Sequence, residues 1–399
     1  MDISVSVEMQ MKRFVAVVAL VVATLVSASA QEVLPLPGTV VNHSPASKGK
    51  YLGSPSICIL PNGRYVVSHD YFGPKTKEFE TAITDIFVSD DKGASWQKTA
   101  TLRGQFWSSI FYHKGDVYIF GTCRHHGNIV IRKSSDGGET WSNPHDAKNG
   151  LIVAGEYHTA PTPVLVHNGR IWKAFEYATH KVRKWGRRYS AMVISAPVNA
   201  DLLDAKSWRC SNVLYSDPAW LGGEFRGWLE GNVVYDYKNK QLLNILRVGT
   251  VKGVGEEQCA RVVVSPNGKT ISFDTEKGFM PFPGGAKKFT IRYDERTKRY
   301  WTLANTTEAD KLVIKNDKTR NVLTLCSSED LVSWKQERVV VSHPDVMYHG
   351  VQYVDWQFEG EDIVAVIRTA WEDEEGHAHN QHDSNYIIFH RVEKFAEKR

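Results

Sequence analysis

Two stretches of eight residues share one pattern: Ser89-Asp90-Asp91-Lys92-Gly93-Ala94-Ser95-Trp96 and Ser134-Ser135-Asp136-Gly137-Gly138-Glu139-Thr140-Trp141. Both fit S-x-D-x-G-x-(S/T)-W, which is typical of a hairpin turn. The aspartate caps turn amides, the glycine takes a positive φ, and the tryptophan packs back on the sheet. Weaker copies occur at Ser265–Phe273 and Ser327–Trp334, with a lengthened copy at Ser195–Trp208. The recurrence predicts a protein built from repeats.

A second unit recurs between these octets, in which two apolar strands flank a short polar turn. Its six copies are Ser56–Ser68, Ser109–Gly121, Val164–Glu176, Val233–Val248, Phe289–Ala304 and Gln352–Arg368. One such hairpin plus its octet has the length of a four-stranded propeller blade. The sequence therefore predicts an all-β fold, a single β-propeller of six antiparallel blades over residues 31–399. The last blade lacks a fourth strand, and Glu32–Val41 is expected to supply it and close the ring.

The first 30 residues have the features of a signal peptide. Lys12-Arg13 precedes the apolar run Phe14–Val26, and Ala28-Ser29-Ala30 provides a small-residue cleavage site. Residues 1–10, ahead of Met11, fit an upstream extension or a misplaced start. The mature chain is then expected to begin near Gln31 and to be exported to a bacterial periplasm or cell surface.

Composition excludes several classes of protein. The formal net charge is only +4 and no basic run occurs, so a nucleic-acid partner is not expected. No segment after the signal is long and apolar enough for membrane insertion. The five cysteines are scattered without a CxxC pair, which argues against a disulfide framework or a zinc knuckle. We interpret them as mostly buried thiols.

Propeller topology predicts that reactive side chains gather on one face. The connections that precede the inner strand and follow the second strand of each blade emerge together, whereas the octets emerge on the opposite face. Asp91 and Asp136 are therefore assigned to turns. The gathered residues are His43, His69, Arg124-His125-His126, His158, Arg226, Glu230, Arg247, Lys287-Lys288, His349, Arg368 and His379-Asn380-Gln381-His382-Asp383.

From this set we select candidates for catalysis and for substrate binding. The catalytic candidates are His43, His69, His126 and His158, since an imidazole titrates near neutral pH. The substrate-binding candidates are Glu230, Arg247, Arg226, Lys288 and His349. Each has a structural alternative: His69-Asp70 also fits a hydrogen-bonded pair at a strand end, and Glu230 also fits a turn cap.

Arg247 is the most informative of these residues, because it ends the apolar strand Leu242–Leu246 near the expected axis. A buried unpaired guanidinium is costly, so an anionic ligand is its natural partner unless Glu230 pairs with it. No cofactor is expected. His379 and His382, with Asp383, suggest a bound metal, but a clear third ligand is missing.

These features resemble the sialidase-like propellers of secreted bacterial carbohydrate enzymes. Several stretches look in particular like the propeller α-L-rhamnosidases that remove rhamnose from glucuronic acid in plant arabinogalactan, and like the lyases that cut rhamnose–uronate linkages, including ulvan lyases. The stretches are His43-Ser44-Pro45-Ala46, Gly53-Ser54-Pro55-Ser56, Ser68-His69-Asp70-Tyr71-Phe72-Gly73-Pro74, Trp228-Leu229-Glu230-Gly231-Asn232, Gly284-Gly285-Ala286-Lys287-Lys288-Phe289 and Gln352-Tyr353-Val354-Asp355-Trp356-Gln357.

The resemblance carries expectations about the site. The rhamnosidases imply one essential histidine near the N-terminus, best matched by His43 and next by His69. The lyases imply paired histidines, a tyrosine and an arginine, matched by His126, His158 and Arg247 with no tyrosine assigned. These relatives are seven-bladed, so seven blades remain an alternative to our count of six. Sialidase proper is disfavoured, because the F/Y-R-I-P motif is absent and no Tyr–Glu pair is assigned.

The predicted function is a glycoside hydrolase, with a polysaccharide lyase and a non-catalytic glycan-binding propeller as alternatives. A histidine could activate water to hydrolyse a rhamnose–glucuronate bond. A histidine could instead remove the C5 proton of a uronate while Arg247 neutralises its carboxylate, which gives β-elimination. The same face could also bind glycans without catalysis. In each case the expected partner is an acidic plant or algal glycan.

Overall fold

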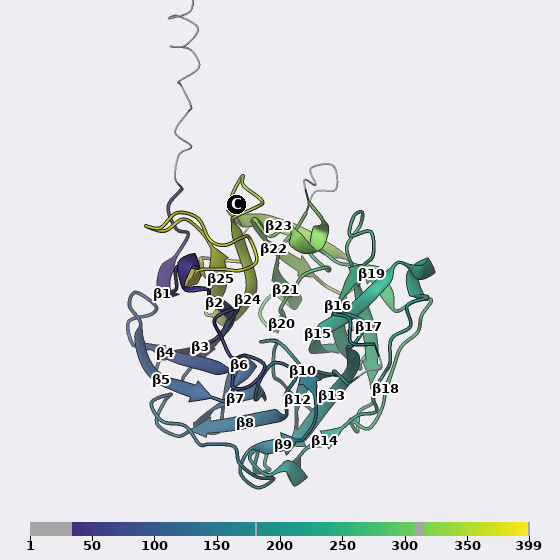
Figure 1. The fold of residues 1–399 in the computed structure, drawn as a ribbon. Helices are drawn as coiled ribbons and strands as arrows, with labels where there is room; N and C mark the ends of the chain where they lie inside the picture. The colour runs from purple at the N-terminus through teal and green to yellow at the C-terminus, as the bar shows by residue number, and fades with distance from the viewer. Residues whose placement is uncertain (1–33, 180–181, 308–313, 398–399) are drawn as a thin grey trace, which may run out of the picture. The chain divides into compact units, whose positions relative to one another are not determined.

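The computed structural model describes residues 34–179, 182–307 and 314–397. The predicted signal peptide, residues 1–30, lies outside the described residues. The unit Leu36–Arg399 is compact, and its described part forms six antiparallel sheets arranged around one axis (Figure 1). The prediction of an all-β propeller is confirmed, with six blades rather than seven. Among the described residues, no helix has both the length and the apolar character needed to span a membrane.

The blades follow one another along the chain, each from its innermost strand outward. Blade 1 contains β2 (Tyr51–Ile59), β3 (Tyr65–Phe72), β4 (Ile83–Ser89) and β5 (Gln97–Arg103). Blade 2 contains β6 (Phe106–His113), β7 (Asp116–Thr122), β8 (Ile129–Ser134) and β9 (Leu151–Val153). Blade 3 contains β10 (Tyr157–His158), β11 (Leu165–His167), β12 (Arg170–Tyr177), β13 (Ser190–Pro197) and β14 (Arg209–Cys210); β10 and β11 both pair with β12.

The second half of the ring has the same order. Blade 4 contains β15 (Phe225–Asp236), β16 (Gln241–Thr250), β17 (Gln258–Val264), β18 (Ile271–Ser272) and β19 (Phe279–Pro281). Blade 5 contains β20 (Ile291–Asp294), β21 (Arg299–Ala304), β22 (Val322–Ser328) and β23 (Trp334–Ser342). Blade 6 contains β24 (Gly350–Glu359), β25 (Asp362–Ala370), β26 (Tyr386–Val392) and β1 (Thr39–His43). Short 3-10 turns occur at η1 (Ala46–Lys48), η2 (Ala205–Ser207), η3 (Trp220–Gly223) and η5 (Asn316–Lys318).

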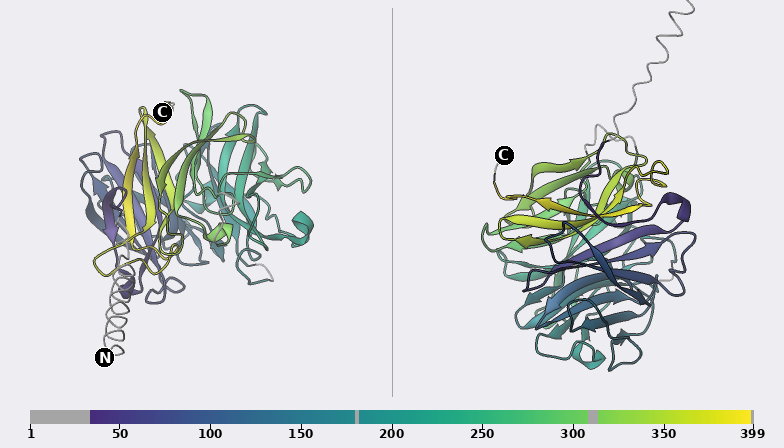
Figure 2. Two further views of the ribbon diagram at one scale, coloured as in Figure 1. Left: turned by 90° about the horizontal axis from the view of Figure 1, so that it is seen from above. Right: turned by 90° about the vertical axis from the view of Figure 1, so that its left-hand side faces the viewer.

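The ring is closed by the N-terminal strand, as the sequence predicts. β1 pairs antiparallel with β26, with Thr39 opposite Phe389 and His43 opposite Tyr386, so both ends of the propeller meet in blade 6 (Figure 2). The strand begins later than the predicted Glu32–Val41. Pro35 and Pro37 fall in that predicted stretch, and proline has no amide hydrogen to donate to a ladder.

The octets form the turns that their pattern predicts. Asp91 Oδ1 accepts a hydrogen bond from the Ser95 amide at 2.9 Å, and Asp91 Oδ2 accepts one from the Ser95 hydroxyl at 2.5 Å. Asp136 accepts a bond from the Thr140 amide at 2.9 Å in the same manner. These bonds lower the pKa of Asp91 to about 2. Both carboxylates serve turns, as expected.

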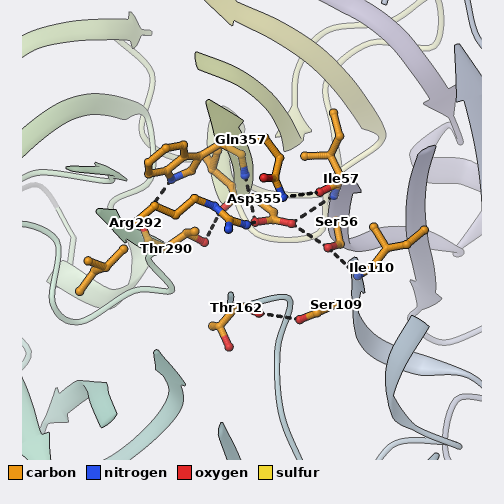
Figure 3. A network of polar contacts seen from close by, with 12 residues as sticks. Ser56, Ile57, Ser109, Ile110, Thr162, Thr290, Arg292, Asp355 and Gln357 are labelled. Atoms are coloured by element: carbon orange, nitrogen blue, oxygen red, sulfur yellow. Dashed lines mark hydrogen bonds and ion pairs between the residues drawn. The ribbon is translucent and has the colours of Figure 1, made fainter. Parts of the chain in front are cut away.

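Each blade places one polar side chain at the axis, from its inner strand or from the residues next to that strand. Together they form what we call the axial ring: Ser56, Ser109, Thr162, Asn232, Thr290 and Asp355. All six are buried. Their bonds run between blades, as Figure 3 shows around Asp355. Its Oδ2 accepts bonds from the Ser56 hydroxyl at 2.7 Å and the Ile57 amide at 3.1 Å, and Oδ1 accepts one from Arg292 at 3.2 Å. The Ser109 hydroxyl donates to the Thr162 carbonyl at 2.7 Å.

Four residues that lie two positions before a member of the axial ring have a positive φ. They are Ser54 (33°), Trp107 (46°), Glu230 (60°) and Tyr353 (51°). Each stands in a β-bulge, where the pairing of the inner strand with its neighbour shifts register. Positive φ is costly for non-glycine residues, and bulges redirect side chains, so these positions are candidates for a functional site. We call these four the bulge residues.

Candidate functional site

A pocket of about 810 Å³ opens over the axis on the predicted functional face. Three of the bulge residues line it: Ser54, Trp107 and Tyr353. Its arginine wall consists of Arg226, Arg247, Arg320 and Arg368 with Tyr353, and its aromatic wall consists of Phe106, Trp107, His125 and Trp185. Asp136 of the second octet lines a different cavity, together with Asn62 and Gly115 of the hairpin turns.

Three arginines of the arginine wall surround one tyrosine. Tyr353 sits on the bulge of β24, and its hydroxyl lies 3.4 Å from Arg247 Nη1. The guanidinium carbons of Arg368 and Arg320 lie 4.6 Å and 5.6 Å from the centre of the Tyr353 ring. These arginines come from β16, β25 and the segment before β22, so blades 4, 5 and 6 all contribute charge.

The arginines differ in how their charge is compensated. Arg247 pairs with Glu230 at 2.7 Å, and Arg226 pairs with Asp317 at 2.5 Å. Across the described residues, Arg320 and Arg368 have no carboxylate within ion-pair distance. Arg320 donates to the Gln352 side chain at 2.6 Å and the Asp317 carbonyl at 2.8 Å, and Arg368 donates to the His382 carbonyl. Burial lowers the pKa of Arg368 to about 10 and also lowers that of Arg320. Glu230 and Asp317 act on Arg320 at longer range, and Asp383 and Glu230 act on Arg368, so the positive charge of these two arginines is compensated only in part.

A buried carboxyl group faces the arginines from blade 1. Asp70 lies near the end of β3, the second strand of blade 1, and lines the pocket. Its Oδ1 accepts a bond from the Thr84 hydroxyl at 2.6 Å, and its Oδ2 accepts one from the Trp107 amide at 2.8 Å. Burial raises its pKa to about 8, although Arg368 opposes the shift. Asp70 is thus protonated at neutral pH and can donate a proton.

The aromatic wall centres on His125. Its ring stacks on Phe79 at 4.3 Å and meets Trp107 edge-on at 4.3 Å. Phe79 and Trp185 are 61% and 43% exposed, which is unusual for such large rings. Exposed flat rings beside a charged pocket offer a surface on which a sugar ring can stack.

A second cluster lies behind the aromatic wall and does not line the pocket. His126 Nε2 lies 2.9 Å from the Tyr189 hydroxyl, and the His158 ring lies 4.4 Å from the Tyr189 ring. His158 Nδ1 bonds Glu176 Oε2 at 2.6 Å. Burial lowers the pKa of His126 to about 2 and that of His158 to about 3, and raises that of Glu176. Both histidines are therefore neutral bases.

The histidines predicted from the N-terminal region lie outside the central pocket. His43 lines a separate cleft and lies 2.9 Å from Asp373. His69 is buried between blades, where Asn42 Nδ2 lies 2.9 Å from its Nε2. Successive side chains of a strand point to opposite faces. On β3 it is Asp70, not His69, that reaches the pocket.

Two predicted substrate-binding residues also lie elsewhere. Lys288 is fully buried, and its ammonium donates to the Val354 carbonyl at 2.6 Å and the Thr290 hydroxyl at 2.7 Å, beside the axial ring. His349 lies 2.7 Å from carboxylate oxygens of both Asp345 and Glu372. Neither residue lines the pocket. Arg226 and Arg247 do line it, and Glu230 reaches it through its ion pair with Arg247.

The sequence analysis missed Tyr353, Arg320 and the role of Asp70, and it assigned no Tyr–Glu pair. The structure brings one tyrosine and one glutamate together. The Tyr353 hydroxyl and the Glu230 carboxylate contact the same nitrogen, Nη1 of Arg247. Both belong to the bulge residues. In the sequence, the only feature that could have indicated Tyr353 and Glu230 as a pair is that both lie near the start of a predicted inner strand.

The suggested metal ligands are arranged poorly for a cation. His379 Nε2 lies 3.8 Å from Asp383 Oδ2, and the Arg368 guanidinium lies 3.1 Å from His382 Nδ1. Elsewhere in the described chain, ligand atoms of His343, Asp345 and His349 lie within 4.8 Å of one another. The two imidazole rings there stack nearly parallel at 3.4 Å. A metal ion binds a histidine nitrogen in the plane of the ring, and one ion cannot lie in the planes of two parallel stacked rings. We therefore assign no metal to this cluster.

No protein-family profile and no curated protein matches this sequence. Solved propellers do match. An α-L-arabinanase from Penicillium chrysogenum in complex with arabinobiose has 14% identity and a TM-score of 0.56 over 91% of this chain and 99% of that chain. An α-L-arabinofuranosidase from Fusarium graminearum with an iminosugar inhibitor has 10% identity and a TM-score of 0.55 over 90% and 98%. Trypanosoma rangeli sialidase in complex with sialic acid has 13% identity and a TM-score of 0.52 over 90% and 59%. Such low identities establish the sialidase-like propeller fold alone.

Proposed function

We propose that this protein is a glycoside hydrolase that acts on a sugar bearing a carboxylate. The observation that carries the proposal is the arginine wall: Arg320 and Arg368 lie beside Tyr353 without counter-ions among the described residues. Arginine matches a carboxylate through two parallel hydrogen bonds, and a buried site strengthens this contact. The propellers of the same fold noted above include an α-L-arabinanase, an α-L-arabinofuranosidase and a sialidase in complex with sialic acid.

The pocket contains the groups for a two-step hydrolysis. Protonated Asp70 would donate its proton to the leaving oxygen. The Tyr353 oxygen would bond to the anomeric carbon, while its proton passes to Glu230, which shares Arg247 with it. In the second step, ionised Asp70 would take a proton from water, and the oxygen of that water would bond to the anomeric carbon. The bond from this carbon to the Tyr353 oxygen would break, and Glu230 would return its proton to that oxygen. Tyrosine nucleophiles of this kind are a recognised exception to the two-carboxylate pattern.

The finer specificity is an inference from the sequence resemblance. The cationic pocket suits the glucuronate of a rhamnose–glucuronate linkage, and the exposed aromatic rings suit a neutral neighbouring sugar. We keep release of α-L-rhamnose from arabinogalactan as the first specificity to assay. Export to the periplasm or cell surface belongs to the same proposal, and N-terminal sequencing of the mature protein should find a start near Gln31.

A second candidate is β-elimination at a uronate, although the residues that would perform it do not line the pocket and His158 and Tyr189 are buried. Tyr189 contacts both His126 and His158, and it supplies the tyrosine that the sequence analysis left unassigned. A neutral histidine would take the C5 proton while tyrosine protonates the leaving oxygen. Unlike hydrolysis, elimination leaves an unsaturated uronate, which absorbs ultraviolet light.

Product analysis separates the candidates. Incubation with a panel of rhamnose- and uronate-containing plant and algal glycans should release a saturated sugar without a gain in ultraviolet absorbance. A gain in absorbance would instead indicate elimination and would assign the reaction to the cluster of His126, His158 and Tyr189. Binding of glucuronate without any product would indicate that the protein is a glycan-binding propeller without catalytic activity.

A further inference from the structure

A second cleft opens beside the central pocket, between the outer strand of blade 6 and blade 1. Its volume is about 680 Å³, and its lining extends from His43 at the end of β1 to Arg103 at the end of β5. Glu78 lines both this cleft and the central pocket. The two cavities therefore adjoin at Glu78, and a glycan chain that left the central pocket over this residue would enter the cleft.

Six cationic side chains line this cleft, which we call the lysine cleft: Lys48, Lys50, Lys75, Lys77, Lys98 and Arg103. Three carboxylates oppose them. Asp85 is already saturated, because it accepts bonds from Tyr71 at 2.8 Å, Lys98 at 2.7 Å and Thr101 at 2.7 Å. Glu80 lies 3.6 Å from Lys77. Glu78 accepts a bond from the Gly73 amide at 2.8 Å and lies 3.3 Å from His125.

Part of the positive charge is left over. Considering the described residues, Lys48, Lys50 and Arg103 have no carboxylate within ion-pair distance. Exposed lysines are usually just solvated, and singly they indicate nothing. Here six cations converge on one concavity, although the whole chain carries a net charge of only +4. A concave surface with an excess of positive charge focuses the field and attracts anions.

We propose that the lysine cleft binds a second uronate of the same glycan whose first acidic sugar occupies the central pocket. This inference rests on the proposed function, and it makes the substrate a polymer with repeated carboxylates rather than an isolated acidic sugar. Lysines recognise charge rather than a fixed orientation, because each ammonium is a point charge on a flexible stem. The cleft therefore adds affinity that salt weakens.

The test uses calorimetry on the full chain carrying Tyr353→Phe, so that probes are not consumed. The probes are glucuronate and hexagalacturonate. The variant Lys48→Ala/Lys50→Ala/Arg103→Ala should bind the hexamer at least roughly tenfold more weakly, with a smaller salt dependence. Its affinity for glucuronate should not change. The matched control, Lys206→Ala/Lys269→Ala/Lys277→Ala, removes the same charge from exposed lysines outside both cavities and should bind both probes normally.

Equal losses in the two triple variants would overturn the lysine cleft, as would a hexamer that binds no more tightly than glucuronate. A sulfated hexasaccharide that depends on the cleft more strongly than hexagalacturonate does would overturn the uronate assignment. Failure of the proposed function has a different signature: Arg320→Ala would leave glucuronate binding unchanged, whatever the lysine cleft does to the hexamer.

Discussion

The two walls of the central pocket differ in what holds their chemistry in place. The arginine wall keeps permanent cations, and two of them remain only partly compensated because hydrogen bonds to carbonyl and amide oxygens replace counter-ions. The aromatic wall and the cluster behind it keep His126 and His158 neutral, since burial makes their protonation unfavourable. In the proposed function the first wall recognises an anion, whereas the second presents ring surfaces in front of two neutral histidines. The proposed hydrolysis uses the first wall for chemistry, whereas elimination would use the cluster behind the second.

The largest expected effect comes from removing one hydroxyl on either side. Tyr353→Phe should lower kcat by at least roughly 10³-fold, because the nucleophile is lost. Tyr189→Phe, the matched removal of a hydroxyl from the cluster behind the aromatic wall, should lower kcat less than tenfold. Both variants should keep the wild-type melting temperature. The reverse ranking of the two kcat values would assign the reaction to the histidine cluster.

The next effect concerns Asp70 and pH. As the proton donor with a pKa of about 8, Asp70 should keep activity level below that pH and let it fall as pH rises further. Asp70→Asn should lower kcat by roughly 10²-fold and abolish this alkaline limb. His126 and His158 should add no acidic limb between pH 5 and 8, because their pKa values are depressed to about 2 and 3. A wild-type profile with a limb near pH 6.5 would contradict this assignment.

Asp70 also links pH to stability, and the sign follows from its raised pKa. The folded protein binds the Asp70 proton up to pH of about 8, whereas an unfolded chain releases it near pH 4. Folding is therefore penalised progressively as pH rises between these values. Thermal melts of Asp70→Asn should show a weaker decline of stability over this range than the wild type.

A smaller effect tests charge recognition on the arginine wall. Arg368→Lys should lose roughly tenfold in kcat/KM on a uronate substrate, about 1.4 kcal/mol, since lysine cannot make the two-point contact. A substrate whose uronate is reduced to the neutral sugar should be used poorly by the wild type and should suffer little further loss in the variant. Equal losses on both substrates would mean that Arg368 only supports the fold.

The sequence contained most of the architecture. The octets and hairpin turns are local patterns, so Asp91 and Asp136 could be assigned to turns before any tertiary contact was known. The propeller topology then predicted which connections share a face. The predicted start of β1 was too early. The need to cover an exposed strand edge indicates that a closing strand exists but not where it begins, and Pro35 and Pro37 exclude the first part of the predicted stretch.

The site could be predicted only in part, because the bulges are not local patterns. A bulge inserts one residue and reverses the alternation of the strand beyond it. The orientation of Tyr353 therefore depends on the bulge before Asp355, whose side chain bonds Ser56 in the axial ring. That ring joins Ser56 to Asp355 across nearly 300 positions, which a single sequence cannot reveal. Likewise the sequence does not show which of the neighbours His69 and Asp70 faces the pocket. The pairing of β3 decides this, since it places His69 between blades and Asp70 in the pocket.

The smallest expected effect concerns the aromatic wall. Trp185 is 43% exposed and lines the pocket beside His125 and Trp107. If its ring only stacks on a neutral sugar, Trp185→Ala should raise KM by about two- to tenfold, corresponding to about 0.5–1.5 kcal/mol for such a contact, and leave kcat unchanged. Trp185→Phe, which keeps a flat ring, should restore most of the affinity.

The contrast with the arginine wall makes this prediction specific. Because stacking involves no charge, the Trp185→Ala loss should be insensitive to salt and equal on the uronate substrate and on its reduced, neutral form, whereas the Arg368→Lys loss should differ between the two substrates. Initial rates at two salt concentrations on both substrates measure this directly. A Trp185→Ala variant that loses kcat instead of KM would place the ring among the groups that position the reacting bond, and the division of labour between the two walls would have to be redrawn.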